Sequence, residues 1–596
     1  MNLEDYQEIW FVDFEYQATE GERPVVNCMV AHELRTGQTL RCFTEELCGC
    51  RVPPFNIGAD SLVVAYFASA EMGCFRVLSW AFPLHLLDLY VEYRRLRNGA
   101  LGIRESTSLV AALAWLGLQC FIPAQKGEMR ELSLRGGPYT REEQRQLLDY
   151  CQADVMALKP LFKKLLSGIS EQPALLAGNY MKAVAFMEHT GVPLDTNLYG
   201  LLKTHWNPVK LKLVQQVDKE TGFYDGFAFR RKRFGQWVAL RNISWPLLPT
   251  GTLQLDKEAW KKMTKLYPEL TPHAQLRETL SALKDLKLPM GHDGCNRCLL
   301  SPFRSKTGRN QPSTNRFIFG LPAWLRSLIK PPKGHAVAYL DYRQQEFAIA
   351  AALSEDENMI KAYQSGDPYL AFARMAGAVP PEATRETHPK ERKLYKQCAL
   401  AVQYEMGAAS LGSSLGISTI RARKLLHDYR KTFAEFARFK DDYALTVNVT
   451  GVASTRTGWK MQVGPRTKGT TVRNFPIQSA GAEILRLACY ELTRQGITLC
   501  CPIHDAALIM ARVEDIETVV AKARAIMEAA SRIITGGLTI TIDQYIVRYP
   551  DRYMDEDRGR DMFRHLLGIL AEMEKTTPSQ LGANLATAPP FTNRDN

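Results

Sequence analysis

The first 165 residues alternate short apolar runs with longer segments of helical periodicity. The runs Ile9–Phe14, Val25–Leu34 and Ser61–Tyr66 have the length of strands, and the second follows a turn that contains Gly and Pro. Ser108–Leu118 and Arg141–Leu166 instead repeat their apolar positions at helical spacing. Strands that alternate with helices predict an α/β domain that ends near residue 165.

Beyond this domain the pattern changes several times. Residues 200–300 are basic and favour helices, residues 300–380 favour strands, residues 382–450 favour helices, and residues 450–550 are mixed. The segment after Lys575 consists mainly of Thr, Pro, Ala and Asn, which is typical of a disordered tail. The sequence therefore predicts at least one further domain of mixed α and β structure.

Composition narrows the class of protein. With 596 residues and 46% hydrophobic content, the chain is long enough for two or more cores. Its net charge of +12 favours a polyanionic partner. The 13 scattered cysteines are typical of a reduced, cytoplasmic protein. Met1–Tyr6 is too polar for a signal peptide, and no apolar run approaches the ~20 residues that span a bilayer, so we expect no membrane contact.

Two apolar segments far apart in the chain each carry one aspartate. Ala338–Tyr342 contains Asp341, Cys500–Ile509 contains Asp505, and both segments are interpreted as buried strands. A buried carboxylate is costly unless it is paired or binds a metal. Two of them, brought together, would hold two Mg²⁺ ions that clamp the attacking and leaving oxygens of a phosphoryl transfer. A single aspartate would more simply face solvent or cap a helix.

A basic helix is predicted between these two aspartates. Arg392, Lys396, Leu400 and Tyr404 recur every four residues and therefore share one helical face. Alone, such a face is most simply explained as solvated surface. The acidic segments on both sides favour a site for phosphate groups instead.

This order of acidic strand, basic helix and His-Asp strand resembles the family A DNA polymerases, of the DNA polymerase I type. The resemblance implies an α/β, RNase H-like exonuclease domain followed by an α+β right-hand polymerase with palm, fingers and thumb. The implied boundaries are 1–165 for the exonuclease domain, 166–300 for connecting helices and thumb, 301–380 and 451–555 for the two parts of the palm, 381–450 for the fingers, and 556–596 for a C-terminal helix and tail.

The match around Asp341 includes Tyr342, Gln344 and Glu346. The resemblance implies that Asp341 and Asp505 bind the metals and that the other three contact the incoming nucleotide. Glu346 would lie beneath the sugar and exclude a 2′-hydroxyl. A glutamate favoured by the positive end of a helix dipole is a compatible, simpler explanation for Glu346.

The basic helix would bind the nucleotide's triphosphate. The resemblance assigns this role to Arg392 and Lys396, and Lys396 would also protonate the pyrophosphate as a general acid. Tyr369 stands where the family has a phosphate-contacting histidine, and Tyr404 would close over the templating base. Leu400 replaces the usual aromatic residue.

Further residues would contact the primer–template DNA. The resemblance assigns this role to Arg309, Asn474, Gln478 and His504. Arg309 would enter the minor groove, where acceptors are similar for all correct pairs, and so sense geometry without reading sequence. For Arg309 and Gln478, ordinary loop residues are the alternative. Ala506 lacks the second acid of the family's His-Asp-Glu motif, and the basic loop Arg230–Arg233 is explained equally well by DNA phosphate contacts or by solvation.

A second set of acids lies in the N-terminal domain. Asp13 and Glu15 share one face of a strand, and Tyr150 lies one helical turn from Asp154. The set resembles the 3′–5′ proofreading exonucleases, which implies that Asp13, Glu15 and Asp154 hold two Mg²⁺ ions and that Tyr150 orients the attacking water. Glu71 takes the place of the family's middle aspartate, with a longer side chain.

The resemblance thus implies a monomeric DNA polymerase that replicates a bacteriophage genome in the host cytoplasm and proofreads its product. Its partners would be primer–template DNA and deoxynucleoside triphosphates, its cofactor Mg²⁺ with Mn²⁺ as a substitute, and it would have no 5′ flap-nuclease domain. Two alternatives stay open: a catalytically silent DNA-binding protein that keeps a polymerase shape, which Ala506, Glu71 and Leu400 favour, and a protein in which only the exonuclease is active.

Overall fold

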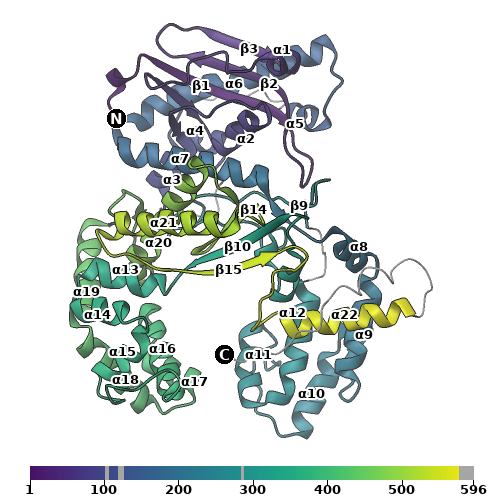
Figure 1. Ribbon diagram of the computed structural model, residues 1–596, viewed down its shortest axis with the longest axis vertical. Coiled ribbons are helices and arrows are strands. Elements are labelled where there is room, and N and C mark those ends of the chain that lie inside the picture. Colours follow the sequence, from purple (N-terminus) through teal and green to yellow (C-terminus); the bar gives the residue numbers. More distant parts are fainter. Residues whose placement is uncertain (101–105, 119–125, 283–287, 576–596) are drawn as a thin grey trace. The chain divides into compact units, whose positions relative to one another are not determined.

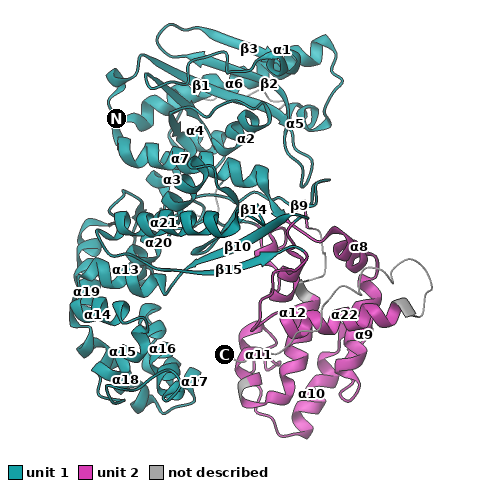
Figure 2. Ribbon diagram, viewed as in Figure 1, with its two compact units in different colours: residues 1–192, 290–312, 332–549 teal, residues 193–289, 313–331, 550–596 magenta. Residues whose placement is uncertain are grey.

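The computed structural model describes residues 1–100, 106–118, 126–282 and 288–575, which form two compact units (Figure 2). Unit 1 comprises Met1–Val192, Met290–Pro312 and Pro332–Tyr549, and unit 2 comprises Pro193–Pro289, Ser313–Pro331 and the residues from Pro550 onward. The predicted disordered tail after Lys575 lies outside the described residues. No helix in the described ranges is both long and apolar enough to cross a bilayer.

Unit 1 contains a mixed five-stranded sheet near its N-terminus (Figure 1). Its strands are β1 (Glu8–Gln17), β2 (Val25–Glu33), β3 (Thr39–Phe43), β4 (Ser61–Ala65) and β5 (His85–Asp88). The order is β3-β2-β1-β4-β5, with β1 antiparallel to β2 and parallel to β4. The three predicted strands are confirmed because their β-branched and aromatic residues pack on both faces of this sheet.

Seven helices accompany this sheet in the described part of the chain. They are α1 (Thr44–Gly49), α2 (Ser69–Val77), α3 (Leu89–Arg97), α4 (Leu109–Trp115), α5 (Lys126–Arg135), α6 (Arg141–Leu165) and α7 (Glu171–Thr190). The long helix α6 starts at a capping box between Thr140 and Glu143, which satisfies two otherwise unpaired amides. Both helices predicted from periodicity are present.

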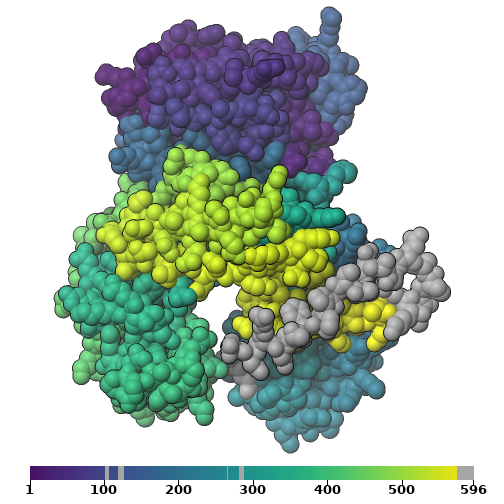
Figure 3. Space-filling model, viewed as in Figure 1, coloured from purple at the N-terminus to yellow at the C-terminus, as the bar shows by residue number. Residues whose placement is uncertain are grey.

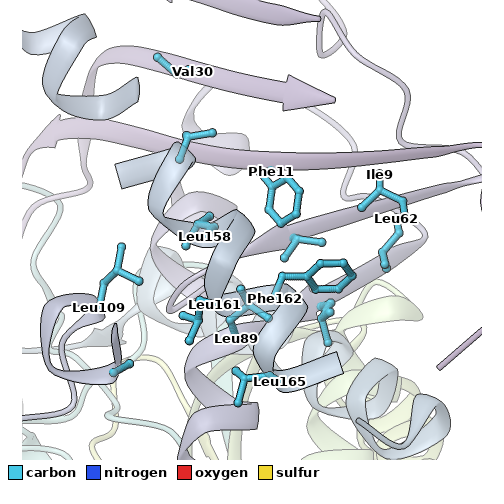
Figure 4. Packing of buried hydrophobic residues seen from close by; sticks show 14 of the residues in the cluster. Ile9, Phe11, Val30, Leu62, Leu89, Leu109, Leu158, Leu161, Phe162 and Leu165 are labelled. Carbon is cyan, nitrogen blue, oxygen red and sulfur yellow. The ribbon is translucent and has the colours of Figure 1, made fainter. Parts of the chain in front are cut away.

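The core of this region lies between the sheet and α6 (Figure 4). It includes Ile9, Phe11, Val30, Leu62, Leu89, Leu109, Leu158, Leu161, Phe162 and Leu165. Phe11 and Phe162 meet edge to face with ring centroids 5.5 Å apart. Each such fully buried side chain contributes about 1.5–3 kcal/mol relative to an exposed one, and this packing fixes the strand that carries Asp13 and Glu15.

A second, four-stranded antiparallel sheet of unit 1 is built from distant segments (Figure 1). Its strands are β10 (His335–Tyr342), β13 (Thr498–Ile503), β14 (Ala506–Arg512) and β15 (Ile542–Arg548). The order β13-β14-β10-β15 places β10 between two strands that come much later in the chain. β10 therefore forms both of its strand pairs with segments that lie far from it in the sequence.

The segments between the strands of this second sheet are mainly helical. They are α13 (Gln345–Ser354), α14 (Glu357–Gln364), α15 (Pro368–Met375), α16 (Pro389–Gln403), α17 (Ala408–Leu415), α18 (Thr419–Thr432), α19 (Ala434–Thr450), α20 (Gly469–Arg494) and α21 (Ile516–Thr535), with the short strands β11 (Val452–Ser454) and β12 (Lys460–Gln462). The helical prediction for 382–450 is confirmed. The strand-rich prediction for 300–380 is wrong, because its apolar residues after β10 lie on helices α13 to α15. Figure 3 shows the side chains of α15 to α18 gathered in one lobe of the unit.

Unit 2 is mainly helical. Its helices are α8 (Thr196–Thr204), α9 (Trp206–Asp218), α10 (Arg231–Leu240), α11 (Lys257–Leu266), α12 (Thr271–Ala282) and α22 (Arg560–Lys575). The predicted loop Arg230–Arg233 is wrong, because helix α10 begins at Arg231. Arginine is a good helix former, and the buried pair Phe234 and Val238, one turn apart, anchors the helix.

Candidate active sites

Asp341 and Asp505 lie close together at one edge of the four-stranded sheet. Asp341 is the penultimate residue of β10, and Asp505 lies in the turn between β13 and β14. The backbone amide of Tyr342 donates to the carbonyl oxygen of Asp505 at 3.3 Å, which ties the two segments together. The structure therefore brings the two predicted metal ligands together.

The position of Asp505 differs from the prediction in one respect. The apolar run Cys500–Ile509 is not one strand but a hairpin, whose turn consists of His504 and Asp505. His504 adopts φ +47°, the left-handed conformation that a tight hairpin turn requires. The turn leaves Asp505 at the sheet edge and His504 exposed beside it.

The electrostatics of this pair favour a cation. Burial, Asp505 and Asp543 together raise the pKa of Asp341 to about 7. Burial also raises the pKa of Asp505, while Arg309 and His504 act in the opposite direction. Among the described residues, Asp341 Oδ1 has no hydrogen-bond partner, so it has a free coordination position.

Asp543 is a third carboxylate that the sequence analysis missed. It lies on β15 directly opposite Asp341, whereas Ala506 lies opposite Asp341 on the other side. Directly opposed residues project from the same face of a sheet. Asp543 also forms an ion pair with Arg343. The only sequence signal was an acid within a strand-like run, and nothing local links it to β10.

Glu346 lies in the first turn of α13 and meets two other predicted residues. An Arg309 guanidinium nitrogen is 3.6 Å from a Glu346 carboxylate oxygen. The half-exposed Tyr404 hydrogen-bonds Glu346, although burial is the main reason that the pKa of the tyrosine is raised. Gln344, with φ +45°, is the N-cap residue that redirects the chain from β10 into α13. Three residues predicted to contact nucleotide or DNA therefore converge.

The basic helix α16 presents its two cations to the buried ring of Tyr369. The Arg392 guanidinium carbon and the Lys396 ammonium nitrogen lie 5.9 and 5.8 Å from the ring centroid. Arg392 is also paired with Asp367, the N-cap residue of α15. This ion pair, which the sequence analysis missed, fixes Arg392 next to Tyr369.

The remaining predicted residues are placed as follows. The side chain of Tyr342 is buried and its hydroxyl donates to the Met527 carbonyl at 2.7 Å, so its predicted nucleotide contact is restricted to the backbone. Asn474 and Gln478 lie one turn apart on α20 and are partly exposed. Gln478 is thus a helical residue and not a loop residue.

The second set of acids also assembles. Ligand oxygens of Asp13, Glu15 and Asp154 lie within 4.8 Å of one another, and each residue is partly exposed. Asp13 and Glu15 come from β1, and Asp154 comes from α6, which packs against it. Tyr150, one turn before Asp154, hydrogen-bonds it, and burial followed by the nearby acids raises the pKa of Tyr150. The arrangement can hold divalent cations.

Glu71 does not join this group of three, but it lies beside it. It is 4% exposed in the first turn of α2, and its Oε2 has no hydrogen-bond partner in the described part of the chain. Burial, followed by Asp13, Asp88 and Glu15, raises its pKa well above the usual value. Asp88 instead accepts backbone amides of Phe67, Ala68 and Tyr90, in keeping with a structural role.

A family profile matches the part of the chain that contains most of the second sheet and its helices. The profile of DNA polymerase family A matches residues 319–543, which include Asp341, Glu346, the basic helix and Asp505. We refer to residues 319–543 as the family A region. All three carboxylates of the four-stranded sheet lie inside this family A region.

Curated DNA polymerases are also similar to this chain. The chain is 24% identical over 438 residues to DNA polymerase I of Chloroflexus aurantiacus, covering 67% of this chain and 46% of that protein. It is 29% identical over 226 residues to the DNA polymerase of Mycobacterium phage D29, covering 36% and 35%. The chain therefore spans less than half the length of these two relatives.

A solved structure extends the fold comparison to most of the chain. The POL domain of Pol1 from M. smegmatis, in complex with DNA primer-template and dNTP, matches with a TM-score of 0.69 at 17% identity. The match covers 90% of this chain and 95% of that one. At this level of identity the match shows that the two proteins share a fold.

Proposed function

We propose that this protein is a DNA-templated DNA polymerase that adds deoxynucleotides to a primer 3′ end by two-metal phosphoryl transfer. The carrying observation is the meeting of Asp341 and Asp505 at one sheet edge of the family A region. Glu346 and the cations Arg392 and Lys396 lie on helices of the same unit, where they would orient the sugar and neutralise the triphosphate.

The residues at the sheet edge suit a hard divalent cation. Mg²⁺ is usually held by one or two carboxylates together with substrate phosphates. Asp341 and Asp505 would hold it, and the Oδ1 of Asp341, which has no hydrogen-bond partner among the described residues, supports this assignment. When bound, the ions would activate the primer hydroxyl and stabilise the leaving pyrophosphate. Lys396 would donate a proton to the pyrophosphate.

The polymerase architecture is proposed with its parts named. Residues 301–380 and 451–555 would form the palm, 381–450 the fingers, and 166–300 connecting helices and thumb. The fold shared with a POL domain supports this division. That POL domain was solved with primer-template and dNTP, which supports the same partners here.

We further propose that the N-terminal sheet and its helices form an RNase H-like 3′–5′ exonuclease domain. The cluster of Asp13, Glu15 and Asp154 supports it, and Tyr150 would orient the attacking water. Similarity to the polymerases of Mycobacterium phages D29 and L5 supports a replicative role for a bacteriophage genome in a host cytoplasm.

Primer extension tests the polymerase proposal. Purified protein is incubated with a 5′-labelled primer–template, the four dNTPs and Mg²⁺, and the same reaction is repeated with EDTA. The proposal expects Mg²⁺-dependent extension to the end of the template. DNA binding without extension by the parent protein would favour the silent binding protein instead. Shortening of the primer without extension would favour an exonuclease alone.

A further inference from the structure

One segment of unit 1, residues 302–308, is held along its backbone by side chains from other elements. Five of its carbonyl oxygens accept side-chain hydrogen bonds. A buried backbone carbonyl outside regular structure needs a partner from the backbone, a side chain or water. The 302–308 segment leads directly into Arg309, so the position of the segment determines the position of the Arg309 backbone.

Most of these bonds come from helix α3 of the N-terminal region. The donor and acceptor pairs are Tyr90 to Pro302 (3.4 Å), Arg94 to Phe303 (3.3 Å) and Arg304 (2.8 Å), and Asn98 to Lys306 (2.7 Å). The three donors recur every four residues and so share one face of the helix and its C-cap. Asn98 is 2% exposed and donates a second bond to the Lys460 carbonyl.

The family A region holds the same segment from its own side. Arg486 of α20 donates to the Gly308 carbonyl at 2.7 Å, and its guanidinium lies 4.7 Å from the Phe303 ring centroid. The indole of Trp459 donates to the Lys306 carbonyl at 2.9 Å. Phe303 has φ +56°, a strained conformation that persists only where surrounding contacts determine it.

The approach of α3 to the family A region is unusually close. Gly99, just after the helix, has φ +83°, and a Cβ there would lie 2.2 Å from the carbonyl oxygen of Gln462. The amide of Gln462 in turn donates to the Asn98 carbonyl at 2.7 Å. Only glycine fits at this contact, so the end of α3 is fixed against β12.

The two ends of this connection are the two candidate active sites. At one end, the Arg309 amide donates to Ser305 Oγ at 2.8 Å, and the guanidinium reaches Glu346. At the other end, Asp88 caps α3 and accepts the amides of the residues just before α2, the helix that carries Glu71. Helix α3 and its caps therefore contact both the segment that leads to Arg309 and the segment that leads to Glu71.

We propose that Tyr90, Arg94 and Asn98 are positioning residues through which the N-terminal domain sets Arg309 at the primer terminus. The inference rests on the proposed function, in which Arg309 senses the minor groove there. A displacement of about 1 Å in such a group costs on the order of 10²-fold in rate. Correct primer ends would therefore be extended efficiently only when α3 holds the 302–308 segment.

A double-mutant cycle between Asn98 and Arg309 tests this coupling. Asn98→Asp keeps the shape of the side chain and removes its amide donor. Nucleotide addition is measured as kcat/KM on matched and on mismatched primer ends. We expect Asn98→Asp to reduce addition to matched ends about tenfold, with little change on mismatched ends. In an Arg309→Ala background, the same change should cause no further loss.

Two further variants separate positioning from general damage. Arg94→Lys keeps a cation that can reach one of the two carbonyls, so it should lose less than Arg94→Ala. Asn27→Asp is the matched control, because Asn27 is also a buried amide of the N-terminal region and donates to the Ser133 carbonyl at 3.1 Å. It should leave nucleotide addition on both kinds of end unchanged.

The outcomes distinguish this inference from the function on which it rests. If Asn98→Asp lowers matched addition equally with and without Arg309, the positioning role is wrong. Equal losses on matched and mismatched ends would also overturn it. A parent protein that extends no primer would reject the polymerase proposal itself. Thermal unfolding of each variant shows whether a loss reflects misfolding, in which case Arg94→Lys provides the test.

Discussion

Asp341 of β10 and Asp543 of β15 stand directly opposite each other in an antiparallel pair. On the other side of Asp341 the opposing residue is Ala506, where the family has a glutamate. Asp341 therefore still has a second acid beside it, but this acid lies on β15 and not on β14. Asp543 forms an ion pair with Arg343, so the guanidinium offsets the charge of this second acid.

Removal of either principal acid should abolish nucleotide addition. Asp341→Ala or Asp505→Ala should reduce single-turnover extension by at least about 10³-fold, because each loss removes support for a cation worth several kcal/mol in the transition state. Primer–template binding, measured by fluorescence anisotropy, should persist. Extension within a fewfold of the parent by either variant would show that these residues are not the metal ligands.

The metal-free protein should lose stability as pH rises from about 4 to about 7 because of Asp341. The folded-state pKa of this group is raised to about 7 from 3.8. The folded protein therefore binds the extra proton in this window, and the stabilisation, complete below 3.8, is lost as pH passes 7. The free energies of unfolding of the parent and of Asp341→Asn are measured with urea in the presence of EDTA. Their difference should change by on the order of 1–2 kcal/mol between pH 5 and 7.5.

The variant Asp543→Asn is a control for the same unfolding experiment. Asp543→Asn removes one of the charges that raise the pKa of Asp341, so the pH window of the parent should move to lower pH. Identical pH profiles for the parent, Asp341→Asn and Asp543→Asn would contradict the electrostatic coupling of the two carboxylates.

Glu346 should act as the barrier to ribonucleotides. Glu346→Ala opens the space beneath the sugar, so ribonucleotide addition relative to deoxyribonucleotide should rise about 10- to 200-fold. Glu346→Gln retains the bulk and should stay close to the parent. Single-nucleotide insertion kinetics measure the ratio, and an unchanged ratio in the alanine variant would assign the barrier to another residue.

The two activities should be separable. Asp13→Ala or Glu15→Ala should remove 3′-end degradation by about 10³-fold and leave nucleotide addition intact, since the acids of the N-terminal sheet and those of β10 belong to different sheets. Degradation of labelled single-stranded DNA and extension of a primer are measured on the same preparations. Parallel loss of both activities would contradict separate sites.

Glu71 gives a finer test of the same site. Its buried Oε2, for which the described ranges offer no hydrogen-bond partner, is expected to complete the metal site beside Asp13. Glu71→Asp should therefore retain some degradation of single strands and Glu71→Ala almost none. Degradation at the parent rate by Glu71→Ala would show that Glu71 only fills space. A parent protein that degrades no DNA would show that the N-terminal domain is not catalytic.

The local sequence pattern was sufficient to predict a strand or helix where one residue type repeats on one face of that element. The strand that carries Asp13 and Glu15 and the helix that carries Arg392 and Lys396 both follow from such repeats. The apolar run around Asp505 was misread because a two-residue hairpin turn leaves no Gly or Asn signal when His504 adopts the left-handed conformation.

Contacts between segments far apart in the chain could not be predicted from local sequence patterns. Asp543 becomes a neighbour of Asp341 only through the strand order β14-β10-β15, which no short segment encodes. The same holds for Asn98 and the 302–308 segment, whose contact depends on how a helix and a distant loop pack. The pairs Asp367–Arg392 and Asp543–Arg343 were missed for this reason, although each member is visible in the sequence.

The strand order of the four-stranded sheet also has a consequence during synthesis. The N-terminal sheet and α6 are complete once residue 165 has left the ribosome, and this region can fold while translation continues. β10 instead waits for both of its neighbours, β14 and β15, and the last of them ends at Arg548. A nascent chain would thus assemble the acids of β1 and α6 long before Asp341 of β10 meets Asp543. A ribosome stalled before β15 would display an unpaired edge of β10 to chaperones.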